Sequence, residues 1–410
     1  MVLSKPELRV GLLLAVAMFL SGVTAASTYP YSSVVAVEFL GMSGPLYSVV
    51  IAVSSIVGAT LSGIFGYFSD RLRDRRLLAL FSAFSGCVGY GLIYVFRNTT
   101  AFTVATCLIT PAAMSLFSQN FAYARAYYQM SGSERADLAV SMLRSVFATA
   151  WIVVPPLAGY LAAVASPFDV YLLTAVAYVA CGAVIVFMMR DRATAVPPPK
   201  ASAQQAAEQR TAPIPVVFGL FGILLMTVAM RLVGTAMPLV IVAEMGGSVG
   251  DVGLYAGLAA ACEVPFMILW AYLGLRIPRT IIIFANGLLL CLYLVVASGL
   301  TSVQALLWLQ PLNGLAMAAL LTTTISYTQD AIKGRVGLSS SLIDILGVAA
   351  SLLGAVIFGV VSAIAQYRVA ITISGAVAAL GGLAVLLTEY GPAILRRPPD
   401  IPDPGNVDER

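Results

Sequence analysis

Long apolar stretches alternate with short polar segments along almost the whole chain. An apolar run of roughly 18 or more residues is long enough to cross a bilayer as a helix. The strands of a membrane β-barrel would instead be about ten residues long, with alternating polarity. The pattern therefore predicts an all-α membrane protein. The predicted spans are twelve, at roughly 9–30, 44–66, 77–96, 101–128, 139–164, 168–189, 214–242, 250–273, 279–298, 302–327, 337–363 and 367–388.

Composition excludes a soluble globular protein, because 60% of the residues are hydrophobic, only 10% are charged and the mean hydropathy is +0.93. Most of the 23 lysines and arginines lie on the side of the N-terminus, whereas the opposite loops hold only Arg97 and Arg368. Basic loops stay in the cytoplasm. We therefore expect a multi-pass membrane protein with both termini cytoplasmic and the first span retained. Twenty arginines against three lysines indicate a GC-rich bacterial genome, and hence a bacterial inner membrane. The net charge of +4 reflects this topology, so we expect no nucleic-acid partner.

The spans divide into two groups of six. A proline- and glutamine-containing segment at 190–213 separates them and is expected to be a flexible cytoplasmic linker. The expected domains are a six-helix bundle at 1–189, the linker, a second six-helix bundle at 214–390 and a disordered cytoplasmic tail at 391–410. Transporters are often built from two related halves in this way.

A weak internal repeat supports two related halves. Tyr67 and Arg71 follow the second span, and Tyr272 and Arg276 follow the eighth, so that both pairs are related by the same offset of 205 residues. The second copy lacks the aspartates of the first.

The most charged segment is Gly66–Arg76, with the sequence GYFSDRLRDRR. It resembles the loop between helices two and three of the major facilitator superfamily, except that Arg73 stands where the family usually has glycine. The resemblance implies that Asp70 meets the positive N-terminus of helix eleven and holds the two halves together on the cytoplasmic side. The alternative is a basic loop that only sets topology. The residues expected to form a cytoplasmic gate are Gly66, Asp70, Arg71, Arg75 and Arg125.

A second resemblance covers nearly the whole membrane domain. The chain is similar to the bacterial sugar efflux transporters in several predicted spans, although Ala126 replaces an acid of that family and Asp344 replaces a neutral polar residue. The residues that carry the resemblance are Phe121–Arg125, Met142–Arg144, Ala150–Ala158, Met237–Leu239, Glu263–Pro265, Leu309–Gln310, Asn313 and Gln329–Asp330.

This second resemblance implies a secondary active transporter that works by alternating access and exports sugars or sugar-like solutes in exchange for protons. The alternative within the same superfamily is a proton antiporter for drugs or other amphipathic solutes.

Adjacent prolines stand in the fifth predicted span. Pro155 and Pro156 remove two backbone donors from the helix, and Gly159 follows them. We expect either a hinge between the halves or a static kink.

Ionisable residues within the spans need a reason, since each costs about 2.5–3.5 kcal/mol on insertion scales. Glu263 lies midway along the eighth span between apolar neighbours. It is expected to carry the proton or to accept a sugar hydroxyl, or else to form a structural pair with Arg231. Asp344 is either a second protonatable site or a solvated group. The chain has no histidine, so carboxylates must carry any proton.

Polar and aromatic residues complete a candidate solute site, because sugars need hydroxyl partners and a flat apolar face. The alternative role for the asparagine and glutamine side chains is to form hydrogen bonds that hold neighbouring helices together. The candidate substrate-binding residues are Asn120, Tyr123, Arg144, Trp151, Arg231, Gln310 and Asn313.

Other classes of function find little support in the sequence. An enzyme is not expected, because the chain has no histidine, no metal-binding spacing and no nucleotide-binding loop. We expect no cofactor and no metal, with the transmembrane proton gradient as the energy source. The expected partners are a small solute, protons and the bilayer, and the expected state is a monomer. A receptor or scaffold that transports nothing is a further alternative.

Overall fold

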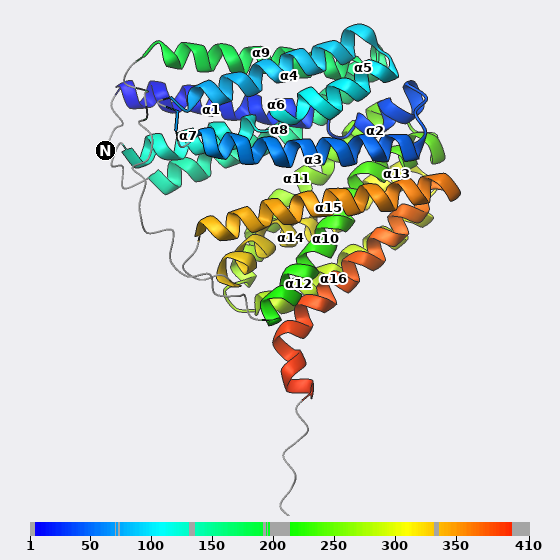
Figure 1. Ribbon diagram of the computed structural model, residues 1–410. Helices are drawn as coiled ribbons and strands as arrows, with labels where there is room; N and C mark the ends of the chain where they lie inside the picture. Colours follow the sequence, from blue (N-terminus) through cyan, green and yellow to red (C-terminus); the bar gives the residue numbers. More distant parts are fainter. Residues whose placement is uncertain are drawn as a thin grey trace, which may run out of the picture.

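The computed structural model describes residues 5–69, 71–72, 74–130, 136–191, 194, 196, 214–331 and 336–395. All secondary structure in these residues is helical, and the helices form two bundles (Figure 1). The first bundle consists of α1 Lys5–Ala26, α2 Ser32–Val34, η1 Val35–Phe39, α3 Gly44–Ser69, α4 Arg76–Phe96, α5 Thr99–Val104, η2 Ala105–Ile109, α6 Thr110–Ala113, α7 Leu116–Met130, α8 Ala136–Val164 and α9 Asp169–Met189.

The second bundle begins after the connector between α9 and α10. It consists of α10 Ile214–Leu239, η5 Val240–Glu244, α11 Val249–Leu273, α12 Arg279–Gly299, α13 Val303–Trp308, α14 Gln310–Ala331, α15 Val336–Ile364 and α16 Tyr367–Leu395. We call the end of the bundles where α1 begins and α16 ends the terminal side, and the opposite end the far side.

Eleven helical segments in the described residues are long and apolar enough to cross a membrane. The remaining expected span, 302–327, is formed by α13 and α14, which meet at Leu309. Its second half is rich in threonine and serine, which makes it less apolar than the others. Thr322, Thr324 and Ser326 bond to carbonyls four residues earlier in their own helix, so these polar groups are satisfied inside the span.

The offset of 205 residues recurs in the backbone. The π-helical turns η1 and η5 end with equivalent bonds, Leu40 N to Val35 O and Met245 N to Val240 O, both 2.9 Å. Gly41 and Gly246 follow them with positive φ values of 66° and 68°, which favour glycine. Arg71 lies over the Tyr67 ring as Arg276 lies over that of Tyr272. The repeat predicted from the sequence is therefore present in the structure.

The bundles touch on the far side and diverge toward the terminal side (Figure 1). On the far side, a Cβ added to Gly253 of α11 would collide with the Pro155 carbonyl and lie 2.5 Å from the Tyr31 hydroxyl. A Cβ on Gly159 of α8 would lie 3.2 Å from the Gly250 Cα. We call this close contact of α8 with α11 the glycine seam.

A second far-side contact joins α3 to α15. Gly44 packs on Ser362, and Gly359 packs on Ser48, so that the two helices run antiparallel. On the terminal side of α3, a Cβ on Gly63 or Gly66 would meet nothing within 4 Å. Glycine therefore allows close approach at one end of this helix pair and lines an open surface at the other.

Pro155 and Pro156 lie inside one continuous helix, α8. The Pro155 carbonyl accepts a hydrogen bond from the fully buried Tyr31 hydroxyl. Pro156 packs on Gly257, at the terminal-side end of the glycine seam. The proline pair is thus part of the contact between the bundles, and the choice between a hinge and a static kink stays a prediction.

Candidate functional site

Glu263 is half-buried on α11, where the helix packs closely against α14. A Cβ on Gly314 of α14 would lie 2.6 Å from the Cys262 Cβ and 3.0 Å from the Glu263 nitrogen. In the part of the chain that the structure describes, no ion pair within 4.0 Å joins Glu263 to Arg231. The ion pair between Glu263 and Arg231, one of the alternatives predicted from the sequence, is therefore not formed in this structure.

Arg231 is exposed on α10 and runs along α15 instead. Its Cβ lies 3.4 Å from the position of a Gly354 Cβ, and its guanidinium Nη2 lies 4.0 Å from that of Gly347. Asp344 stands one turn beyond Gly347, also exposed, and on the face of α15 that carries Ser362 five turns later. Arg231 therefore approaches the stretch of α15 that carries Asp344.

Gln310 and Asn313 are buried in a hydrogen-bonded row within the second bundle. Asn313 Nδ2 donates to Gln310 Oε1 at 2.9 Å, and Gln310 Nε2 donates to the Tyr293 hydroxyl at 3.2 Å. The Tyr293 hydroxyl donates to that of Tyr255 at 3.4 Å. The row joins α11, α12 and α14, so both amides hold helices together in this conformation.

Asn120 and Tyr123 are buried inside the first bundle, at 4% exposure each. Asn120 Nδ2 donates to Ser21 Oγ at 2.9 Å and to Cys181 Sγ at 3.5 Å. The Tyr123 hydroxyl donates to the Thr194 carbonyl at 2.6 Å. Neither side chain faces the second bundle, so the structure does not bring them to Trp151 or Arg231.

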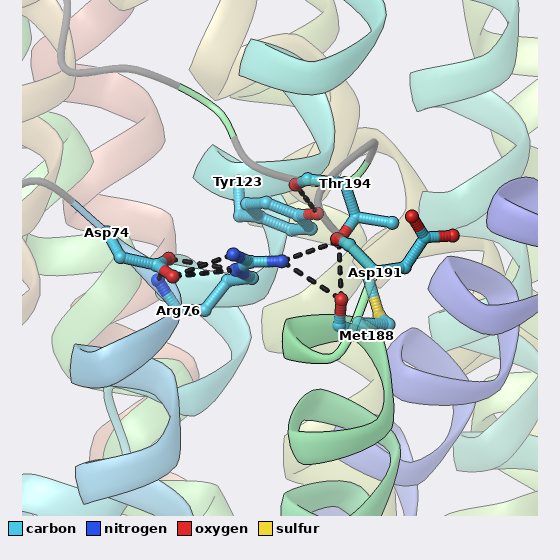
Figure 2. Close-up of polar contacts among 6 residues, drawn as sticks. All are labelled: Asp74, Arg76, Tyr123, Met188, Asp191 and Thr194. Carbon is cyan, nitrogen blue, oxygen red and sulfur yellow. Dashed lines mark hydrogen bonds and ion pairs between the residues drawn. The ribbon is translucent and has the colours of Figure 1, made fainter.

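Tyr123 belongs to a cluster around a buried arginine (Figure 2). Arg76 Nη2 contacts Asp74 Oδ2 at 2.7 Å, and its Nη1 donates to the Met188 carbonyl at 3.0 Å and to the Thr194 hydroxyl. The Arg76 hydrogen bonds hold the pKa of the Asp74 carboxyl below its usual range. Thr194 and Val196 are buried, so this part of the expected linker is packed onto the first bundle.

Trp151 lies where the bundles meet, and its ring stands edge-on to that of Tyr29, with 5.8 Å between centroids. Tyr29 is 43% exposed, and its hydroxyl lies 2.7 Å from the position of a Gly234 Cβ on α10. Gly234 is one turn from Arg231 on the same helix. The structure therefore connects Trp151, through Tyr29, to the helix that carries Arg231.

Arg144 lies three turns before Pro155 on the same face of α8, exposed, with its guanidinium 5.6 Å from the Phe121 ring centre. Farther along α8, the same face packs on α11. Arg144 lies nearer the terminal side, toward which the bundles diverge.

The residues predicted to form a gate lie on the terminal side. Gly66, Arg71 and Arg125 are exposed, and Arg75 is half-buried. Asp70 lies outside the described residues. No group of three or more histidine, cysteine or acidic side chains in the described ranges is arranged to hold a metal ion.

Four residues that make the contacts described above were not predicted from the sequence, namely Tyr31, Tyr293, Tyr255 and Thr194. Tyrosine and threonine are common in membrane helices, and no spacing along the chain marks these four. A faint signal existed only for Tyr31, which follows a proline and a second tyrosine at the end of the first span.

Known proteins with similar sequences cover most of this chain. "Sugar efflux transporter A" of Dickeya chrysanthemi is 26% identical over 385 residues, which are 93% of this chain and 95% of the relative. "Sugar efflux transporter C" of Escherichia coli is 27% identical over 329 residues, or 79% of this chain and 82% of the relative.

Solved structures share the fold. The match to the nucleoside transporter NupG has a TM-score of 0.71 at 11% identity, and the match covers 92% of this chain and 98% of the NupG chain. A bacterial homologue of ferroportin in its inward-facing state has a TM-score of 0.70 at 18% identity, with 94% and 99% covered. A family model, the Major Facilitator Superfamily, matches residues 13–221 and again 219–409. The chain therefore belongs to the Major Facilitator Superfamily, and it is a multi-pass membrane transporter rather than an enzyme.

Proposed function

We propose that this protein is a secondary active transporter of a bacterial inner membrane that exports sugars or sugar-like solutes in exchange for protons. The names of the similar proteins support the solute class. The placement of basic residues supports cytoplasmic termini. In this orientation the terminal side faces the cytoplasm, and the far side faces outward.

One observation carries the proposed mechanism of alternating access. In the residues that the structure describes, the glycine seam and the α3–α15 contact join the bundles near the far side, whereas Arg144 and Asp344 are exposed on the same helix faces nearer the terminal side. This is the arrangement expected of a cytoplasm-open conformer, in which rocking of the bundles would open the other side.

The register of α3 and α15 suggests how the cytoplasmic side closes. Gly44 packs on Ser362, and each residue farther along α3 faces one farther back along α15. Continued toward the terminal side, this register brings the open face of Gly66 against the first two turns of α15. Asp70 follows shortly after and stays the predicted gate acid. The gate is thus a consequence of rigid-body closure.

Carboxylates carry the proton in this proposal. Glu263 is half-buried and has no ion-pair partner among the described residues, so its charge is not fixed by a neighbour. Asp344 lies one turn from Gly347, whose Cβ position is 4.0 Å from the Arg231 guanidinium. We assign proton carriage first to Glu263.

Counterflow in proteoliposomes tests this function. Labelled glucose, arabinose and sucrose, and a cationic drug such as ethidium, would each be followed with and without a pH gradient. We expect at least one sugar to accumulate faster when the gradient is imposed. Transport of the drug without transport of any sugar would instead identify a drug antiporter.

The variant Glu263→Gln removes the proposed proton carrier with little change in shape. We expect it to lose the pH-driven part of sugar transport and to keep exchange of sugar for sugar. Glu244→Gln is the control, because Glu244 is already paired with Arg368 at 3.0 Å near the far side. If transport driven by the pH gradient survives in Glu263→Gln, Glu263 is not the proton carrier.

A further inference from the structure

The turn Tyr29–Tyr31 lies at the point where both bundles meet. Tyr31 is fully buried, and its hydroxyl bonds to Pro155 of α8 beside Gly253 of α11. Tyr29 touches Trp151 of α8 with its ring and Gly234 of α10 with its hydroxyl. Two tyrosines of one turn therefore reach both helices of the second bundle that approach the first bundle here.

The two tyrosines differ in exposure. Tyr31 is 0% exposed and Thr28 is 5% exposed, but Tyr29 between them is 43% exposed. Burial of Tyr31 fits a structural role in the glycine seam. The exposed face of Tyr29 leaves a phenol available at the contact between the bundles, where a solute passing between them would meet it.

Arg231 lies on α10, one turn from the glycine that this phenol contacts. It is one turn from Gly234, and it is exposed between the buried Val228 and Leu232. A guanidinium offers several N–H donors, and a phenol both donates and accepts. The pair suits a solute with neighbouring hydroxyl groups, which present both kinds of partner.

We propose that Tyr29 and Arg231 bind the solute from opposite bundles, and that the solute draws the Tyr29 hydroxyl away from Gly234 and so loosens the far-side contact. This inference rests on the proposed function. Trp151 is then a positioning residue, because its ring faces the edge of Tyr29. Solute binding and opening of the far side are linked through the single turn that also carries Tyr31.

The first test separates binding from turnover. In counterflow with glucose, arabinose and sucrose, Tyr29→Phe should raise KM by about three- to tenfold, the loss expected of one hydrogen bond, with Vmax nearly unchanged. Trp151→Ala should raise KM similarly, and Trp151→Phe should restore it. Tyr327→Phe is the matched control, because that phenol bonds to Thr388 inside the second bundle. A KM for Tyr29→Phe equal to that of the wild type would overturn the inference.

The second test does not depend on turnover. The variant Tyr29→Cys, in a background without the five native cysteines, is labelled with a membrane-impermeant thiol reagent in inside-out vesicles. Labelling should proceed, and the sugar that showed counterflow should slow it severalfold. Labelling that this sugar leaves unchanged contradicts the inference but not the proposed function. Absence of counterflow for all three sugars in the wild type contradicts the proposed function itself.

Discussion

Single glycines determine how closely the two bundles approach. A Cβ on Gly253 would collide with the backbone carbonyl of Pro155, which cannot swing aside as a side chain can. A Cβ on Gly234 would meet only the end of the Tyr29 side chain. The same substitution therefore has different consequences at these positions, because one neighbour is rigid and the other is mobile.

The variant Gly253→Ala should separate α8 from α11 on the far side. Overpacking of a close contact costs about 1–3 kcal/mol, so we expect a lower Tm in detergent together with faster thiol labelling of a cysteine placed at Gly250. Gly63→Ala is the control, because a Cβ there meets nothing within 4 Å. Equal Tm and labelling rates in the two variants would show that the glycine seam is not tight.

The connection between α3 and α4 is held at one end by α9 and the segment after it. Arg76, only 6% exposed in its side chain, bonds to Asp74 before it and to Met188 and Thr194 of the other segment (Figure 2). The loop expected to carry the gate and the start of the connector are therefore attached to each other. We expect movement of one of these elements to be transmitted to the other.

This attachment should be sensitive to acid. The pKa of Asp74 is lowered chiefly by its hydrogen bonds from Arg76. A lowered pKa contributes stability above the ordinary carboxyl pKa of about 3.9, and that stability is lost as the pH falls through the lower, folded-state value. The Tm of Asp74→Asn should therefore lie below that of the wild type at pH 7, and the difference should shrink toward pH 3. A difference independent of pH would show that the Asp74 charge is not involved.

Helices were largely predictable from the sequence, because an apolar run of sufficient length has few alternatives in a bilayer. The division of 302–327 at Leu309 and the π-helical turns η1, η2 and η5 were not, since they depend on local packing. Of the candidate solute residues, Trp151 contacts Tyr29, which reaches the helix of Arg231, but Asn120, Tyr123, Gln310 and Asn313 bond within their own bundles. Their polarity was visible in the sequence, whereas the partner that satisfies each group is set by the fold.

For the whole molecule, the duplicated backbone gives two bundles of similar shape, as the proposed rocking of one bundle against the other requires. Contact on the far side uses glycine, proline and tyrosine, and the terminal side exposes charged residues. The two sides thus differ in chemistry, with a close contact of small and aromatic residues on the far side and exposed charges on the terminal side.

Alternating access is the central claim, and distances between spin labels test it most directly. One pair, Tyr67 of α3 with Ile345 of α15, spans the terminal side, and a second pair, Val164 of α8 with Leu254 of α11, spans the far side; all four residues are exposed. When the transported sugar is added and the pH is changed, the terminal-side distance should shorten as the far-side distance lengthens. Two distances that stay constant, or that change in the same direction, in protein that transports the sugar would contradict alternating access.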